Sequence, residues 1–182
     1  VTSGFTAKTL TVNSGKTFTI NSGHSVTVAG AITDNGNLVV ENNANLLQTN
    51  VSATNTGSIV VKRNSASIQL YDYTLWSSPV AGQNLKSFSP NTLDNRFYSY
   101  DSSQNLYSQV NPSSTSFSPA TGYLIRAPNT WTASTPTTFN GVFTGVPNNG
   151  TITLTGLTPN KFYAVGNPYP SSTPPNQAAT VL

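Results

Sequence analysis

Side chains that could serve as acids, bases or metal ligands are few in this chain. His24 is the only histidine, and the chain has no cysteine. A zinc site needs three or four suitable ligands, and a hydrolase triad needs a base held beside a nucleophile and an acid. Asn21-Ser22-Gly23-His24 supplies neither set, so we interpret His24 as an exposed turn residue. The sequence predicts no catalytic residue, no metal ligand and no cofactor, and the chain is not expected to be an enzyme.

The acidic side chains do not form a recognisable pair. A glycosidase needs two carboxylates that face each other across a cleft, and nothing in the spacing points to such a pair. Segments 34–37 and 101–105 resemble loose calcium loops, but each has one carboxylate where calcium requires six to eight oxygens. We interpret both as turns. Asp72, on a predicted strand, is expected to pair with Arg96 or Arg126.

Aromatic residues form the most suggestive set of side chains. In a strand over 96–100, Phe97 would face one side and Tyr98 and Tyr100 the other. Sugar-binding sandwiches present such rings beside polar groups, and Trp131 lies in a polar loop, "PNTWTASTP". The alternative is that the rings fill the core of a chain poor in Leu and Ile, and for Trp76 we favour the core. The candidate ligand-binding residues are Trp131, Tyr98, Tyr100 and Arg126.

Composition indicates an all-β protein. Of the 182 residues, 36% are hydrophobic, 10% aromatic and only 7% charged. Polarity comes mainly from Ser, Thr and Asn, which suit strands and turns better than helices. No stretch of even ten residues places apolar side chains at helical spacing, so almost no helix is expected.

Charge and hydropathy argue against two classes of partner, nucleic acid and the membrane interior. The net charge is +3, and Lys62-Arg63 is the single basic pair, so no stripe exists to neutralise several phosphates and nucleic-acid binding is not expected. No apolar run approaches the ~18–20 residues of a membrane span.

Residues 1–68 form a repetitive first region, nearly free of Pro and Tyr. Asn-Ser-Gly occurs twice, and Gly15 and Gly23 are expected to give the backbone freedom that these turns need, with Asn13 and Asn21 capping them. Two arrangements remain open: antiparallel hairpins, or a parallel β-solenoid whose strands are successive sides of a coil. We favour the solenoid. The predicted strands are Leu10–Val12, Phe18–Ile20, Val26–Val28, Leu38–Val40, Leu46–Leu47 and Ile59–Val61.

Residues 69–182 form a second region that holds every proline, tyrosine and tryptophan. Short strands separated by turn signals predict an antiparallel β-sandwich, truncated at the C-terminus. The strands are expected near 70–76, 96–100, 105–110, 122–127, 138–144, 151–155 and 161–165.

Several motifs resemble a module of large secreted proteins of Bacteroidetes, especially flavobacteria. They occur in order: "GSIVVKRN" (57–64), "YDYTLWSSPV" (71–80), "RFYSYD" (96–101), "GYLIRAP" (122–128), "FNGVFTGVPNNGTITL" (139–154) and "VGNPYPSS" (165–172). The resemblance implies a cell-surface or secreted multidomain protein, often with a downstream sorting domain for type IX secretion. It implies no particular activity.

We therefore expect a non-enzymatic structural or adhesive segment of an exported bacterial surface protein. The alternative is a carbohydrate-binding module of a secreted polysaccharide-degrading enzyme. Expected partners are other domains of a larger chain, the secretion machinery, a glycan, or a second copy, since the ends of a solenoid are open.

Overall fold

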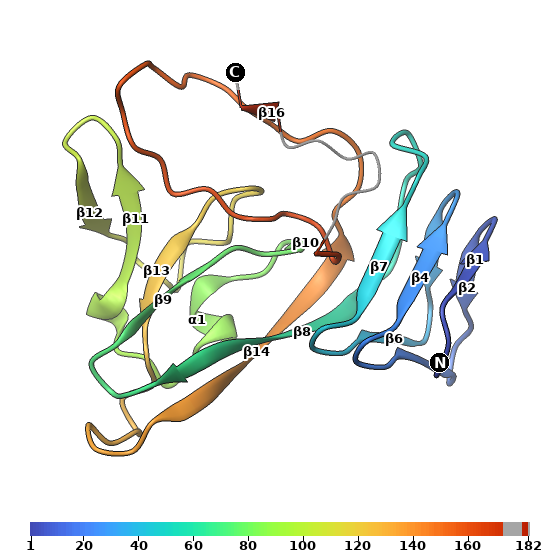
Figure 1. Ribbon diagram of the computed structural model, residues 1–182, viewed down its shortest axis with the longest axis horizontal. Coiled ribbons are helices and arrows are strands. Elements are labelled where there is room, and N and C mark those ends of the chain that lie inside the picture. The colour runs from blue at the N-terminus through green and yellow to red at the C-terminus, as the bar shows by residue number, and fades with distance from the viewer. Residues whose placement is uncertain (173–179, 182) are drawn as a thin grey trace.

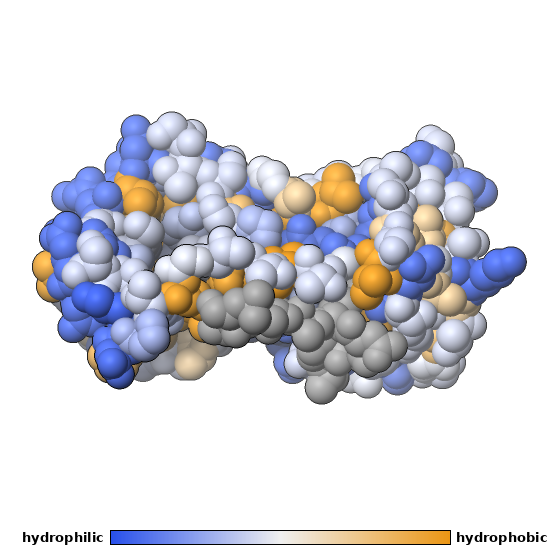
Figure 2. Space-filling model, turned by 90° about the horizontal axis from the view of Figure 1, so that it is seen from above, coloured by the Kyte–Doolittle hydropathy of each residue, from blue (hydrophilic) through white to orange (hydrophobic). Residues whose placement is uncertain are grey.

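The protein consists almost entirely of β-strands. The computed structural model describes residues 1–172 and the backbone of residues 180–181 (Figure 1). Strand accounts for 42% and helix for 4%, which confirms the predicted β class. Seen from above, two wide ends are joined by a narrower middle (Figure 2).

The first region contains seven short strands. They are β1 (Phe5–Ala7), β2 (Leu10–Val12), β3 (Thr17–Ile20), β4 (Ser25–Val28), β5 (Ile32–Asp34), β6 (Asn37–Val40) and β7 (Asn45–Gln48). All pair in parallel, in the orders β1–β4–β7, β2–β5 and β3–β6. Figure 1 shows β1, β4 and β7 side by side. Strands consecutive in sequence do not pair with each other here, so the hairpin alternative is wrong.

A nearly constant spacing brings the partners together. Phe5 lies beside Val26 and Val26 beside Leu46, which are 21 and 20 residues apart. Strands β2, β4, β5 and β7 direct alternate side chains inward, and Val26, Ile32 and Leu38 are fully buried. The sequence missed β1 and β5 because each has too few apolar residues for a clear alternation.

The two Asn-Ser-Gly turns use glycine as expected. Gly15 and Gly23 have φ angles of 70° and 79°, in the region that favours glycine. Each turn is closed by a backbone hydrogen bond, from Lys16 N–H to the Asn13 carbonyl and from His24 N–H to the Asn21 carbonyl. The asparagines therefore contribute their carbonyl oxygens to closure.

The antiparallel part of the fold starts with a long strand that precedes the predicted division, and it contains two antiparallel arrays. Its elements are β8 (Ile59–Ile68), β9 (Tyr73–Trp76), β10 (Val80–Ala81), α1 (Leu85–Phe88), η1 (Asp94–Arg96), β11 (Phe97–Asp101), β12 (Leu106–Gln109), β13 (Tyr123–Arg126), β14 (Thr137–Pro147), β15 (Thr153–Leu154) and β16 (Thr180–Val181). One sheet has the order β12–β11–β13–β9. The other array, β10–β14–β8, continues through a parallel pairing of β8 with β6.

Aromatic rings fill the space between these two sheets. Trp76 on β9 is 8% exposed, and its ring centroid lies 6.1 Å from that of Phe143 on β14. Phe88 of α1 stacks on Phe143 at 4.5 Å and meets Trp76 at 5.1 Å. The core role predicted for Trp76 is confirmed.

The expectation of almost no helix is confirmed, because helix accounts for only 4%. α1 is four residues long, too short to show a helical period, and is capped by Asn84, whose side chain accepts hydrogen bonds from the N–H groups of Lys86 and Ser87. The strand predicted at 161–165 is wrong, because that segment joins the sheet only through a bridge from Val165 to Thr121.

The predicted division at 68/69 falls at the end of β8. One hydrophobic cluster includes buried residues from both sides of this division, for example Val61 and Phe143. The division stays a prediction. The predicted truncation concerns residues mostly outside the described part of the chain.

Gly57→Ala should destabilise the protein far more than Gly15→Ala. Both glycines have positive φ, but a β-carbon at position 57 would overlap the carbonyl oxygen of Asp34, whereas nothing lies within 4 Å at position 15. We expect a loss of at least about 3 kcal/mol for Gly57→Ala and about 1 kcal/mol for Gly15→Ala. Urea unfolding of both variants measures the difference, and equal losses would refute the close approach.

Tyr169→Phe should weaken the protein and flatten its response to alkaline pH. The Tyr169 hydroxyl is buried and donates to the Gly150 carbonyl at 2.6 Å, so its loss should cost about 1–2 kcal/mol. Burial raises the pKa of Tyr169 above its ordinary value. The folded state therefore keeps a proton that the unfolded chain releases, and stability falls as pH rises above about 10.

Unfolding curves at several pH values between about 8 and 11 measure this effect. Tyr169→Phe should show a shallower fall than the unmodified protein. A residual fall is expected, because burial also raises the pKa of Tyr73. An unchanged slope would contradict the role of Tyr169.

Candidate functional site

The sheet β12–β11–β13–β9 has one face on the aromatic core and one face outward. Trp76 pairs with Tyr123 on the core side, and the next pair along, Leu75 with Leu124, points away from it. The outward residues, together called the outer face, are Tyr73, Leu75, Arg96, Tyr98, Tyr100, Tyr107, Gln109, Leu124 and Arg126. Tyr73, Leu75 and Tyr107 are 36%, 44% and 43% exposed. Monomeric proteins seldom expose so many large side chains on one sheet without a partner.

Tyrosine rings on this face contact one another across the strands. The rings of Tyr73 and Tyr98 meet edge to face with centroids 6.0 Å apart, and those of Tyr100 and Tyr107 at 5.1 Å. The Tyr98 hydroxyl donates to the Asn95 carbonyl at 3.0 Å, and the Tyr100 hydroxyl donates to Asn105 Oδ1. These bonds fix the rings, so a ligand would meet an ordered surface.

A shallow hollow of about 240 Å³ lies at one end of the outer face. Tyr100 and Tyr107 form one side, and the segment 162–165 forms the other. Phe162, on that segment, is 72% exposed. The hollow is lined mainly by apolar atoms and aromatic rings.

Two arginines lie at the opposite end of the outer face. Arg126 is 7% exposed, donates from Nη2 to Asn129 Oδ1 at 3.0 Å, and lies over the Tyr71 ring, 6.0 Å from its centroid. Arg96 donates from Nη1 to the Tyr98 hydroxyl at 3.4 Å.

The predicted pairing of Asp72 with an arginine is wrong. The Asp72 carboxylate accepts a hydrogen bond from the Gln69 N–H at 2.8 Å and closes a local turn. The ion pairs in the described residues are Lys62–Glu41 and Lys86–Asp94.

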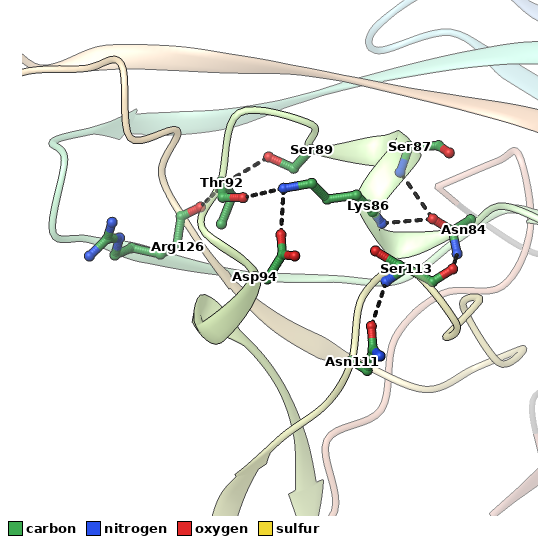
Figure 3. A network of polar contacts seen from close by, with 9 residues as sticks. All are labelled: Asn84, Lys86, Ser87, Ser89, Thr92, Asp94, Asn111, Ser113 and Arg126. Carbon is green, nitrogen blue, oxygen red and sulfur yellow. Dashed lines mark hydrogen bonds and ion pairs between the residues drawn. The ribbon is translucent and has the colours of Figure 1, made fainter.

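A polar network behind the sheet holds the backbone of Arg126 in place (Figure 3). Thr92 Oγ1 donates to the Arg126 carbonyl at 2.8 Å and lies 2.9 Å from Ser89 Oγ. Lys86 donates to the Thr92 carbonyl at 2.8 Å and pairs with Asp94 at 2.7 Å. Figure 3 shows the Arg126 guanidinium directed away from this network.

The structure gathers three of the four predicted ligand-binding residues. Tyr98, Tyr100 and Arg126 all belong to the outer face, whereas Trp131 is half-buried and its ring contacts Phe139 at a centroid distance of 6.3 Å. Sequence reasoning did not place Arg96, Leu75 or Tyr107 among the ligand-binding residues. Strand alternation could have placed Leu75 with Tyr73, but the register that aligns the strands is tertiary.

Other candidate chemistry is sparse in residues 1–172. His24 lies half-buried at its turn. No group of three or more His, Cys, Asp or Glu side chains in the described part could hold a metal ion. No described helix is long and apolar enough to cross a membrane.

Comparison with known families gives one match. A family model for a domain of unknown function (DUF8693) matches residues 1–178. The chain belongs to this family. No curated protein and no solved structure matches it. Because this single family model spans both regions, the outer face and the parallel strands fall within the same family domain.

Thr92→Val should destabilise the protein by about 1–3 kcal/mol, because it removes the donor to the Arg126 carbonyl at a site that is 1% exposed. Ser87→Ala, which removes an exposed hydroxyl from neighbouring α1, is the control and should change stability by less than about 0.5 kcal/mol. Urea denaturation measures both. Equal stability of the two variants would show that the network does not support β13.

Proposed function

We propose that this protein is a non-enzymatic adhesive module that binds polysaccharide through the outer face. The observation that carries the proposal is the row of ordered, partly exposed tyrosines across the sheet β12–β11–β13–β9. Aromatic rings offer a flat apolar surface with a polar edge, which suits the apolar face and hydroxyl rim of a sugar ring. Gln109 and the two arginines add hydrogen-bond donors on the same face.

The shape of the site favours a chain over a small molecule. The hollow of about 240 Å³ is smaller than the 300–1,000 Å³ of typical small-molecule pockets. The tyrosines continue beyond it toward Arg96 and Arg126. A polymer can place one sugar in the hollow and neighbouring sugars along the rings.

We infer a β-solenoid followed by a β-sandwich as the architecture. Three sets of strands pair in parallel in the first region: β1–β4–β7, β2–β5 and β3–β6. In each set the paired residues are 20–22 residues apart in the sequence, which supports a coil. The aromatic layer between two sheets supports the sandwich. Such a coil is a stiff spacer, and an exposed strand edge of a coil suits stacking against a second copy or a neighbouring domain.

The positions of the acidic groups support a binding role over hydrolysis. Asp34 is buried and accepts hydrogen bonds from the N–H groups of Gly36 and Leu38. Hydrogen bonds from Ser103 hold the pKa of Asp101 below its usual range. Both carboxylates accept hydrogen bonds from the N–H groups of local turns. Secretion by the type IX route and display at the bacterial surface stay predictions from the sequence resemblance.

A second candidate is a carbohydrate-binding module of a polysaccharide-degrading enzyme. The hollow beside Tyr107 and Phe162 favours it, because a concave end subsite would suit the terminus of a partly degraded chain. Both functions use the same face. A reducing-end-tagged oligosaccharide bound far more tightly than the intact polymer would select the second candidate.

Tyr107→Ala should weaken polysaccharide binding about tenfold or more. Loss of one stacked ring removes about 1–1.5 kcal/mol, close to a tenfold change in affinity. A glycan array followed by affinity electrophoresis measures it. Phe5→Ala is the matched control: Phe5 is an aromatic residue, 39% exposed, on β1, and its loss should leave binding unchanged.

Two results would contradict the proposal. One is the absence of binding to every polysaccharide tested. The other is a loss of binding in Trp131→Ala while Tyr107→Ala binds normally. That result would move the site to the loop 128–136.

A further inference from the structure

The two arginines of the outer face lie beside the same pair of tyrosines, and neither forms an ion pair in the described residues. Arg96 donates to the Tyr98 hydroxyl, and Arg126 pairs with Tyr73 across β13 and β9. The Tyr73 and Tyr98 rings meet at a centroid distance of 6.0 Å. Two positive charges beside one pair of rings repel each other, so this arrangement calls for a compensating anion.

No side chain of this protein supplies that anion. Each of the five acidic residues is engaged elsewhere. Glu41 and Asp94 pair with lysines, and the other three accept hydrogen bonds in local turns. Arg96 and Arg126 therefore have no carboxylate partner in the described residues.

The donors of both arginines are under-used. Arg126 is more than nine-tenths buried, and Asn129 is the one hydrogen-bond partner that its side chain has in the described residues. The Nε atoms of Arg96 and Arg126 are buried without a partner. A buried charge is costly unless it is paired. A guanidinium with free N–H groups fits a carboxylate or sulfate through two parallel hydrogen bonds.

Tyrosines border the same spot. Tyr73 pairs with Arg126 across β9 and β13, and its ring meets that of Tyr98. Tyr71 lies under the Arg126 guanidinium. A sugar ring on these tyrosines would place an acidic substituent within reach of both arginines.

We propose that the outer face binds an acidic polysaccharide and holds its carboxylate or sulfate groups at the Arg96–Arg126 pair. This inference rests on the proposed function and names its ligand class. Tyrosines bind the ring, and the arginine pair selects the charge.

The test compares binding of the purified protein to three polymers by affinity electrophoresis or calorimetry. Polygalacturonate carries carboxylates, dextran sulfate carries sulfates, and dextran is the neutral match. We expect at least tenfold tighter binding to one or both acidic polymers than to dextran, and the preferred polymer identifies the anion. Added salt should weaken the acidic complexes.

Arg96→Gln should lose about tenfold in affinity for the acidic polymer and little for the neutral one. Arg96→Lys, which keeps the charge without the planar fork, should recover part of the loss. Lys16→Gln is the control, because it removes one positive charge from an exposed turn of the first region. Circular dichroism verifies that each variant is folded.

The outcomes separate this inference from the proposed function. Equal binding of neutral and acidic polymers, with Arg96→Gln unchanged and Tyr107→Ala weakened, overturns the arginine pair and leaves polysaccharide binding intact. Equal losses in Arg96→Gln and Lys16→Gln overturn it too, since net charge would then explain the binding. Failure to bind any polymer overturns both.

Discussion

The two edges of β8 hold the molecule together. One edge pairs in parallel with β6 at Val60 and Val61, and the other pairs antiparallel with β14 along most of its length. A strand has only two edges for hydrogen bonding, so the parallel strands and the antiparallel array share a single sheet. Val61 therefore lies beside Phe143, and the aliphatic core of the first region continues into the aromatic core of the second.

Side chains and a late segment strengthen this junction. Gln48 and Asn55 exchange amide hydrogen bonds, and Asn55 also donates to the Pro147 carbonyl at the end of β14. The Pro170 carbonyl accepts from Leu46 N–H, and Ser172 N–H donates to Asn45 Oδ1. These bonds occupy part of the edge of β7 and protect it from unintended strand pairing.

The outer face follows from the same arrangement. Once Trp76 and Tyr123 face the core that Phe143 helps to form, alternation directs Tyr73 and Arg126 outward. Stacking energies near 1 kcal/mol per ring suit sequence-tolerant attachment along a polymer. In the proposed site the arginines would contribute differently, because a buried unpaired charge such as that of Arg126 discriminates strongly between neutral and anionic partners. We propose that the tyrosines supply affinity and the arginines supply selectivity.

Features that depend on neighbouring residues could be predicted from the sequence. Ser, Thr and Asn in place of helix formers indicated strands, and Gly15 and Gly23 marked turns because few other residues tolerate positive φ. The alternation around Phe97 placed Tyr98 and Tyr100 on one side of a strand correctly. α1 was not predictable, since four residues show no helical period.

The sequence by itself determined strand content, turn positions and the side of the strand on which Tyr98 and Tyr100 lie, because these depend on neighbouring residues. Only the tertiary structure decided that the early strands pair in parallel about 20 residues apart. Only it brought Arg96 and Arg126 to the same pair of tyrosines, Tyr73 and Tyr98, and left Trp131 against Phe139. Register between distant strands depends on which apolar faces bury each other across the whole fold, and no local pattern specifies that choice.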